Sequence, residues 1–173
     1  MAESQFIFRK AESSDLEEIC CLYKAAISHM YECGMYFWSF DVYPTEEDLT
    51  NDVKNKNMFC AIDSASKKIA ACIVLSTVCD EQYNNADWKY VPANPIIVHR
   101  LCVHPEFQNK GLGKTVMNYA DTWAKQNGYN VIRLDAFSGN APSLTMYNTL
   151  GFRKAGEANW VKGLFYLFEK RVQ

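Results

Sequence analysis

The sequence predicts an α/β protein that folds as a single domain over residues 1–173. A chain of this length is close to the usual size of one domain and is long enough to bury a substantial core. Hydrophobic residues make up 49% of the chain and charged residues 22%, which is ordinary for a globular protein and too apolar for a disordered one. Short β-branched runs also alternate with segments of helical periodicity. Together these features indicate helices and strands that share one core.

The start of the chain predicts a strand followed by a helix. Residues 5–9 alternate apolar and polar side chains, as a half-buried strand does. Ser14 and Glu17 have the spacing of a capping box, so a helix is expected over residues 16–30. Apolar residues recur in this helix at three- and four-residue spacing, which indicates a single buried stripe and core packing. These residues are Leu16, Ile19, Cys20, Tyr23 and Ile27.

A connection rich in aromatic residues comes next. It begins at Gly34, and Pro44 and Thr45 then predict the entry to a short second helix that runs to about Val53. The rings of this connection are Tyr36, Phe37, Trp38, Phe40 and Tyr43.

The middle of the chain predicts a hairpin and a loop. Residues 58–62 and 69–78 are apolar and β-branched and flank the polar turn 63–68, so they predict two antiparallel strands. Residues 82–94 are polar and contain two prolines, and we expect them to form a loop.

The second half of the chain predicts the order strand, helix, strand, helix, and then two final strands. Residues 95–103 form the most apolar run. Gly128 and Gly151 follow the two helices in the position that favours glycine. The predicted strands are 95–103, 131–135, 152–157 and 164–170, and the predicted helices are 111–126 and 140–150.

Charge and hydropathy exclude two kinds of partner. The net charge is −2, and positive and negative residues are intermixed, so no basic stripe is available for nucleic acid. The start of the chain lacks a long apolar segment, and His99 and Arg100 interrupt the most apolar run. We therefore expect neither a nucleic-acid partner, nor a membrane span, nor export.

The cysteines indicate a reducing compartment. The seven cysteines are odd in number, form no Cys-x-x-Cys pair and mostly lie in apolar patterns, where a thiol behaves as a small hydrophobe. This composition favours a cytoplasmic protein without a disulfide framework. The three histidines lack ligand spacing with these cysteines, so no zinc or other metal site is expected.

The segment Gln-Asn-Lys-Gly-Leu-Gly at 108–113 is the central motif. It follows the strongest predicted strand and begins a helix, where glycines and exposed backbone N–H groups form a site for a pyrophosphate. Lys110 and Lys114 add positive charge. Such a glycine pair is often only a turn. The two rival phosphate motifs fail, because a Walker A loop needs glycine at Gln108 and a dinucleotide fingerprint needs glycine at Val116.

Two motifs together resemble those of the GNAT N-acetyltransferase family. Leu-Cys-Val-His-Pro at 101–105 leads into the pattern Gln108-x-x-Gly111-x-Gly113. A second pattern downstream is similar to the coenzyme-side helix of that family. It comprises Asn140, Ser143, Leu144, Tyr147, Leu150, Gly151 and Phe152. The resemblance covers about residues 96–157, with one departure, because the family often has alanine where this chain has Ser143.

The resemblance implies a fold and a co-substrate. The fold is a mixed, mostly antiparallel sheet of about seven strands with helices on both faces, in which the fourth and fifth strands splay apart. Acetyl-CoA is the implied co-substrate, with its pantetheine arm hydrogen-bonded like an extra strand at the splay. The residues that the resemblance assigns to the coenzyme are Leu101, Cys102, Val103, Gln108, Asn109, Lys110, Gly111, Leu112, Gly113, Lys114, Asn140 and Ser143.

The resemblance also implies catalytic roles. A backbone N–H near Val103 is the implied oxyanion donor. Tyr147 is the candidate acid for the departing thiolate, since a phenol is protonated at neutral pH, and its alternative reading is a packed core ring. His99 is the candidate base, two residues before Leu101 and so expected on the same strand face. A hydrogen-bonded core histidine or a chain of waters would be alternatives.

The acceptor class is the least defined part of the prediction. Aromatic residues at 36–38, with Trp160 and Phe165, would suit an apolar or cationic amine, or would simply be packing residues. Ile97 stands where lysine-directed relatives often carry glutamate, which favours a small-molecule amine over a protein N-terminus or lysine. A non-catalytic module that binds coenzyme A is a third reading. The oligomeric state is not indicated, which leaves a homodimer open.

Overall fold

The computed structural model describes residues 5–173, which form two compact units. The first unit comprises the described residues up to Val74 together with Arg100–Val116, and the second comprises Leu75–His99 and Met117–Gln173. The strand order is β1-β2-β3-β4 in the first unit and β4-β5-β7-β6 in the second. Strand β4 (Pro95–Val103) and helix α3 (Leu112–Gln126) therefore contribute residues to both units.

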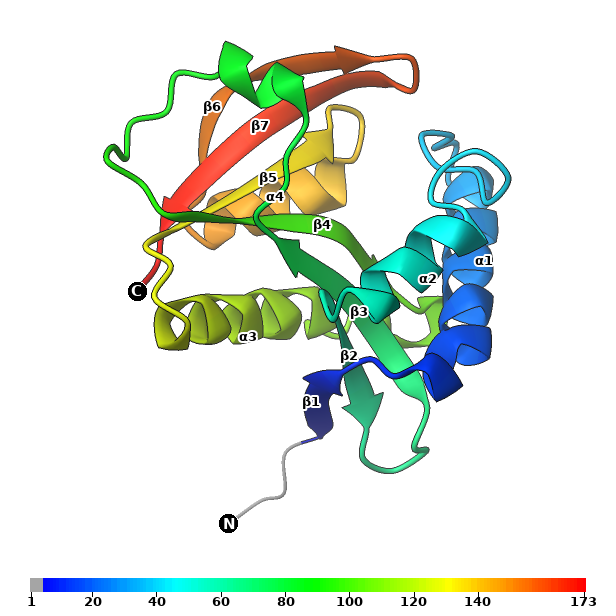
Figure 1. Ribbon diagram of the computed structural model, residues 1–173. Coiled ribbons are helices and arrows are strands. Elements are labelled where there is room, and N and C mark those ends of the chain that lie inside the picture. The colour runs from blue at the N-terminus through cyan, green and yellow to red at the C-terminus, as the bar shows by residue number, and fades with distance from the viewer. Residues whose placement is uncertain (1–4) are drawn as a thin grey trace. The chain divides into compact units, whose positions relative to one another are not determined.

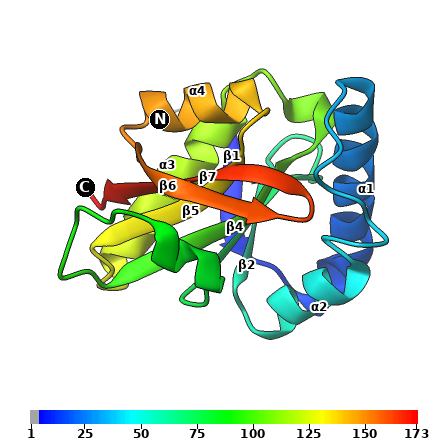
Figure 2. The ribbon, with the colours of Figure 1, turned by 90° about the horizontal axis from the view of Figure 1, so that it is seen from above.

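The first unit has an antiparallel sheet that packs against two helices. The helices α1 and α2 lie side by side in Figures 1 and 2. Their apolar residues form a core with those of β2 and β3, and Tyr23 and Leu49 in this core are completely buried. The elements are β1 (Phe6–Lys10), η1 (Ser13–Asp15), α1 (Leu16–Glu32), α2 (Glu46–Lys54), β2 (Met58–Asp63), β3 (Ile69–Ser76) and η3 (Pro105–Phe107).

The start of α1 differs from the prediction. A short 3-10 turn precedes the helix, and the capping box expected from Ser14 and Glu17 is not formed. The Asp15 carboxylate instead accepts the backbone N–H of Glu12 at 2.8 Å. It also accepts two hydrogen bonds from Arg9, at 2.7 and 2.9 Å. The capping box that forms therefore uses Glu12 and Asp15, and Arg9 of β1 holds the Asp15 carboxylate.

Helix α2 begins as predicted at Thr45. The Thr45 hydroxyl oxygen accepts the backbone N–H of Asp48 at 3.2 Å, and the Asp48 carboxylate accepts the backbone N–H of Thr45 at 2.8 Å. This reciprocal pair satisfies backbone N–H groups at the helix start that have no partner within the helix.

The second unit has a mixed sheet. Strands β4 and β5 are parallel, and β5, β7 and β6 pair antiparallel in that order. The hairpin of β6 and β7 is longer than predicted, because Trp160 and Gly163 are directly opposed and only residues 161–162 form the turn. The elements are η2 (Glu81–Asn85), β5 (Val131–Phe137), α4 (Ala141–Thr149), β6 (Arg153–Trp160) and β7 (Gly163–Arg171).

The predicted loop at 82–94 is fastened to this sheet. The Gln82 side chain exchanges two hydrogen bonds with the backbone of Asn159, at 2.7 and 2.6 Å. Tyr83 is buried in a core cluster with Ile97, and its hydroxyl donates to the Asp135 carboxylate at 2.8 Å. The connection is therefore irregular in backbone but contributes to the core.

Seven strands and four α-helices are present in residues 5–173, with one parallel and several antiparallel strand pairs. The predicted α/β fold class with a mixed, mostly antiparallel sheet is confirmed. None of the described helices has the length and hydropathy needed to cross a membrane.

Candidate functional site

The parallel pairing of β4 with β5 stops before either strand ends. Four residue pairs are opposed, the last being Val98 with Leu134, whereas β4 continues to Val103 and β5 to Phe137. The backbone of residues 101–103 therefore lies beyond the paired stretch. This is the segment that the predicted splay assigned to the coenzyme.

Arg100 has an unusual backbone conformation within β4. Its φ is +50°, in the left-handed region that non-glycine residues rarely adopt because Cβ crowds the backbone. The alternation of side chains along the strand is interrupted at this residue. The expectation that His99 and Leu101 share a strand face assumed regular alternation, and it stays a prediction.

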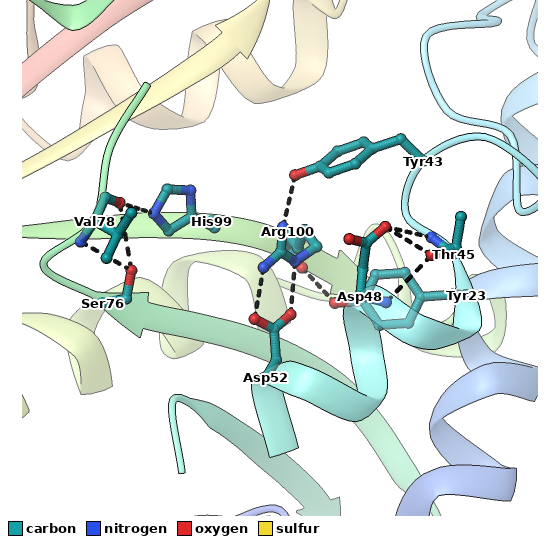
Figure 3. Close-up of polar contacts among 9 residues, drawn as sticks. All are labelled: Tyr23, Tyr43, Thr45, Asp48, Asp52, Ser76, Val78, His99 and Arg100. Carbon is teal, nitrogen blue, oxygen red and sulfur yellow. Dashed lines mark hydrogen bonds and ion pairs between the residues drawn. The ribbon is translucent and has the colours of Figure 1, made fainter. Parts of the chain in front are cut away.

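The Arg100 side chain is held by two residues of the first unit (Figure 3). Its guanidinium donates to both carboxylate oxygens of Asp52, at 2.7 and 2.6 Å, and to the Tyr43 hydroxyl at 2.8 Å. The Arg100 carbonyl accepts the Tyr23 hydroxyl at 2.6 Å. Burial alone would lower the pKa of Arg100, but the hydrogen bonds to Asp52 and Tyr43 outweigh it and raise that pKa. Arg100 is therefore charged at physiological pH.

The sequence analysis did not assign these contacts. One signal was present, because an arginine inside the most apolar run of the chain must find a partner when the strand is buried. The sequence did not indicate which carboxylate would supply it.

The turn after β4 presents a row of backbone N–H groups. Asn109 and Gly111 have φ of +59° and +81°, and α3 begins at Leu112. The first helical-type bond here runs from the Thr115 N–H to the Gly111 carbonyl. Residues 108–111 form a hydrogen-bonded turn, and the N–H groups in the first turn of a helix have no acceptor within that helix. Backbone N–H groups at such a helix start form a site suited to an anion.

Gln108 and Lys110 brace this turn from within. The Gln108 backbone N–H donates to the Pro105 carbonyl at 3.2 Å, and its side-chain amide donates to the Val103 carbonyl at 2.9 Å. The Lys110 ammonium donates to the Glu106 carbonyl at 2.8 Å. Gln108 thus links the turn to the end of β4.

Asn140 and Ser143 meet at the start of α4 in the second unit. The Asn140 side-chain oxygen accepts the backbone N–H of Ser143 at 3.2 Å, so Asn140 is the N-cap of the helix as its position predicted. Its backbone carbonyl accepts the Leu144 N–H at 3.0 Å. Its side-chain amide also carries an NH₂ donor group, which this cap does not use.

Tyr147 lies on α4 and is only 6% exposed. Its ring packs against Phe152 and Phe168, with centroids 5.6 and 6.0 Å away. Its hydroxyl makes no hydrogen bond to any residue in the described part of the chain. Burial, and then the negative charge of Asp135, raise the pKa of Tyr147 well above its usual range. The phenol is therefore protonated throughout the neutral and mildly alkaline range, and it is also a weaker acid than an ordinary tyrosine.

His99 contacts the start of the connection that follows β3 (Figure 3). Its Nε2 lies 2.9 Å from the Val78 carbonyl oxygen. A carbonyl only accepts, so this geometry assigns the proton of a neutral imidazole to Nε2.

The aromatic residues proposed for the acceptor divide into two groups. Trp38 packs against the first core cluster beside Tyr23, and Phe165 is buried, so both serve packing. Tyr36 is 69% exposed. Trp160 is half-buried, and the Lys162 ammonium lies 5.1 Å from its ring centroid.

All seven cysteines are free thiols, and four of them (Cys20, Cys60, Cys72 and Cys102) are buried. No group of three or more His, Cys, Asp or Glu side chains among residues 5–173 is arranged to hold a metal ion.

A strand, a glycine-containing turn and a helix start, in this order, are typical of α/β proteins that bind the phosphates of nucleotides and coenzymes. The model of the Acetyltransferase (GNAT) family matches residues 23–152, and the chain belongs to this family. The resemblance inferred from the two sequence motifs is thereby confirmed. Acetyl-CoA is the acetyl donor of this family.

Solved structures of the family share the fold. An acetyltransferase of the GNAT family from Streptococcus agalactiae has a TM-score of 0.84 at 19% identity, covering 97% of this chain and 96% of that chain. The PaiA N-acetyltransferase from Thermoplasma acidophilum, in complex with coenzyme A, has a TM-score of 0.73 at 20% identity, covering 97% and 99%. The ribosomal-protein-S18-alanine N-acetyltransferase from Escherichia coli has a TM-score of 0.69 at 16% identity, covering 97% and 94%. No curated protein sequence is significantly similar to this chain.

Proposed function

We propose that this chain is an acetyl-CoA-dependent N-acetyltransferase whose acceptor is a primary amine of a small molecule. The observation that carries the proposal is the turn at 108–111 with the helix start that follows it, directly after the part of β4 that does not pair with β5. Such donors match the pyrophosphate of coenzyme A, and the free strand edge matches the amides of its pantetheine arm. The complex of the PaiA enzyme with coenzyme A supports the choice of ligand.

The proposed reaction is direct attack of the amine on the thioester. The amine nitrogen bonds to the acetyl carbon, and the backbone N–H of Val103 stabilises the oxyanion of the tetrahedral intermediate. The carbon–sulfur bond then breaks. After attack the nitrogen loses one proton to a base or to water, and the sulfur leaves as a thiolate that takes one proton from solvent, so the products are an amide and free coenzyme A.

Tyr147 acts in this scheme as a hydrogen-bond donor to the departing sulfur. A thiol has a pKa of about 8.5, and the pKa of Tyr147 lies above the ordinary phenol value of about 10. Complete proton transfer from the phenol to the thiolate would therefore run uphill. A hydrogen bond that strengthens as negative charge develops on sulfur lowers the barrier without that transfer.

Before attack, the extra proton of the ammonium form of the substrate passes to His99 or to water. An alkylamine is mostly charged at neutral pH, so a base is needed before attack. The hydrogen bond from Nε2 to the Val78 carbonyl places the proton of the neutral imidazole on Nε2 and holds the ring.

The choice of a small-molecule acceptor rests on Ile97. This residue is 1% exposed and packs in an apolar cluster with Tyr83 and Leu167, so the start of β4 supplies no carboxylate for a lysine substrate. A protein acceptor is the second candidate, since the same fold occurs in the ribosomal-protein-S18-alanine N-acetyltransferase. The single domain and the cytoplasmic location stay predictions, and the sequence leaves a homodimer open.

Two measurements test the proposal. Isothermal titration with coenzyme A and acetyl-CoA should show saturable binding. Adenosine, which lacks the pyrophosphate and the pantetheine arm, is the negative control for stacking of the base alone. Release of free thiol should then be followed with panels of polyamines, arylamines and peptides. Turnover with small amines supports the proposal. Turnover with peptides alone would show that the acceptor is a protein. Binding of the coenzyme without any turnover would favour a non-catalytic module.

A further inference from the structure

Arg100 holds a backbone conformation that a strand residue does not adopt by itself. Its φ of +50° occurs two residues after the last β4–β5 pair, which ends at Val98. A non-glycine residue in this region is strained and persists only where the surroundings impose it. The residues that follow, 101–103, are those proposed to bind the pantetheine arm and the oxyanion.

The contacts of Arg100 supply that constraint at both ends of the residue. The guanidinium is fixed by Asp52 from α2 and by Tyr43, and the backbone carbonyl is fixed by Tyr23 from α1 (Figure 3). The Arg100 and Asp52 side chains are 15% and 10% exposed, so little water competes for these hydrogen bonds. A two-bond arginine–carboxylate pair is also directional, because the planar guanidinium must face the carboxylate.

We propose that Arg100 is a positioning residue, whose pairing with Asp52 and Tyr43 holds the left-handed turn in β4 and thereby directs the backbone N–H groups of residues 101–103. The coenzyme role of those N–H groups rests on the proposed function. An ion pair that served stability alone would require neither the positive φ nor the hydrogen bond from Tyr23 to the carbonyl. Both features act on the backbone, which indicates that the conformation itself is what the cluster maintains.

Variants with glycine or alanine at position 100 distinguish the effect of the backbone conformation from the effect of losing the side chain. Both remove the guanidinium, but only glycine adopts a positive φ without strain. Asp52→Asn is included in each variant, so that no unpaired carboxylate is left buried. The matched control is Arg9, which also makes a two-bond pair, with Asp15, and whose φ is not positive. Its variants carry Asp15→Asn with glycine or alanine at position 9.

Equilibrium denaturation should show a reversal of sign. At position 100 the glycine variant should be more stable than the alanine variant, and at position 9, within a strand, the alanine variant should be more stable. Coenzyme A should bind the Arg100→Gly variant within about threefold of the unmodified protein and the Arg100→Ala variant about tenfold more weakly, as expected for loss of a preformed backbone geometry. The Michaelis constant for acetyl-CoA should follow this order at temperatures well below unfolding.

Equal coenzyme affinity of the two position-100 variants, with normal binding by the unmodified protein, would overturn the positioning role. The same conclusion follows if alanine is the more stable residue at both positions. If the unmodified protein binds no coenzyme A or acetyl-CoA, the proposed function itself fails, and with it the role assigned here to Arg100.

Discussion

The residues assigned to the coenzyme in the first unit differ in kind from those in the second. In the first unit the turn at 109–114 offers backbone N–H groups, and the side chains of Gln108 and Lys110 only brace it. In the second unit Asn140 and Tyr147 offer side-chain atoms. Backbone donors survive most side-chain substitutions, so the first region should be sensitive only to changes in φ. The second region should be sensitive to the loss of a single atom.

The largest effect is expected for Tyr147→Phe. Removal of the hydroxyl should lower kcat about 100-fold, a typical contribution of one donor to a developing anion. The dissociation constant of coenzyme A should stay within about twofold, because the ring still packs against Phe152 and Phe168. Tyr129→Phe is the control, since that ring stacks on Trp123 at 5.8 Å. An unchanged kcat would remove Tyr147 from the mechanism.

The raised pKa of Tyr147 adds a pH test to the same variant. The phenol loses its proton only above the ordinary value of about 10, so turnover of the unmodified protein should not fall through ionisation of Tyr147 below about pH 10. A decline of kcat between pH 8 and 9 that disappears in Tyr147→Phe would contradict the assigned burial.

His99→Ala should lower kcat/KM about thirtyfold at neutral pH, somewhat less than the usual range for a general base because water can substitute. The pH profile is the sharper measurement. An imidazole base must be neutral, so activity should fall when the pH is lowered and the imidazole becomes protonated, and this acidic limb should vanish in the variant. His104→Ala should keep the limb, since His104 Nδ1 already accepts the Glu106 N–H. Retention of the limb in His99→Ala would assign the base to another group.

Substitutions in the turn after β4 test whether the first unit binds the coenzyme through its backbone N–H groups. Gly111→Ala should weaken coenzyme A binding about tenfold, because alanine is strained at a φ of +81° even though the space for its Cβ is open. Asn109→Gly should bind at least as well as the unmodified protein, since glycine relieves a φ of +59°. Titration calorimetry measures both. If the two variants lose affinity equally, the turn acts through its side chains.

The smallest effect is expected for Lys110→Ala. Its ammonium is exposed and donates to the Glu106 carbonyl, so its loss should weaken coenzyme A binding no more than about threefold at physiological salt. The difference should shrink further at high ionic strength. A loss of a hundredfold would show that charge, and not backbone geometry, dominates the first region.

Local signals predicted most of the fold. Thr45 caps α2, and Gly128 and Gly151 end helices with φ of +80° and +84°, because each signal acts within one turn of chain. The prediction was wrong at Ser14, where Arg9 drew Asp15 into a different cap. The final hairpin was predicted too short, since its length depends on pairing between strands and not on the sequence of either strand.

The sequence alone determined the family motifs, the glycine turn before α3 and the position of Tyr147 on α4. Only the tertiary structure decided the left-handed conformation of Arg100, the burial that raises the pKa of Tyr147, and the tautomer of His99. The physical reason is distance along the chain. Arg100 meets Asp52 and Tyr23 across 48 and 77 residues, and no local pattern encodes which partners will meet once the chain has folded.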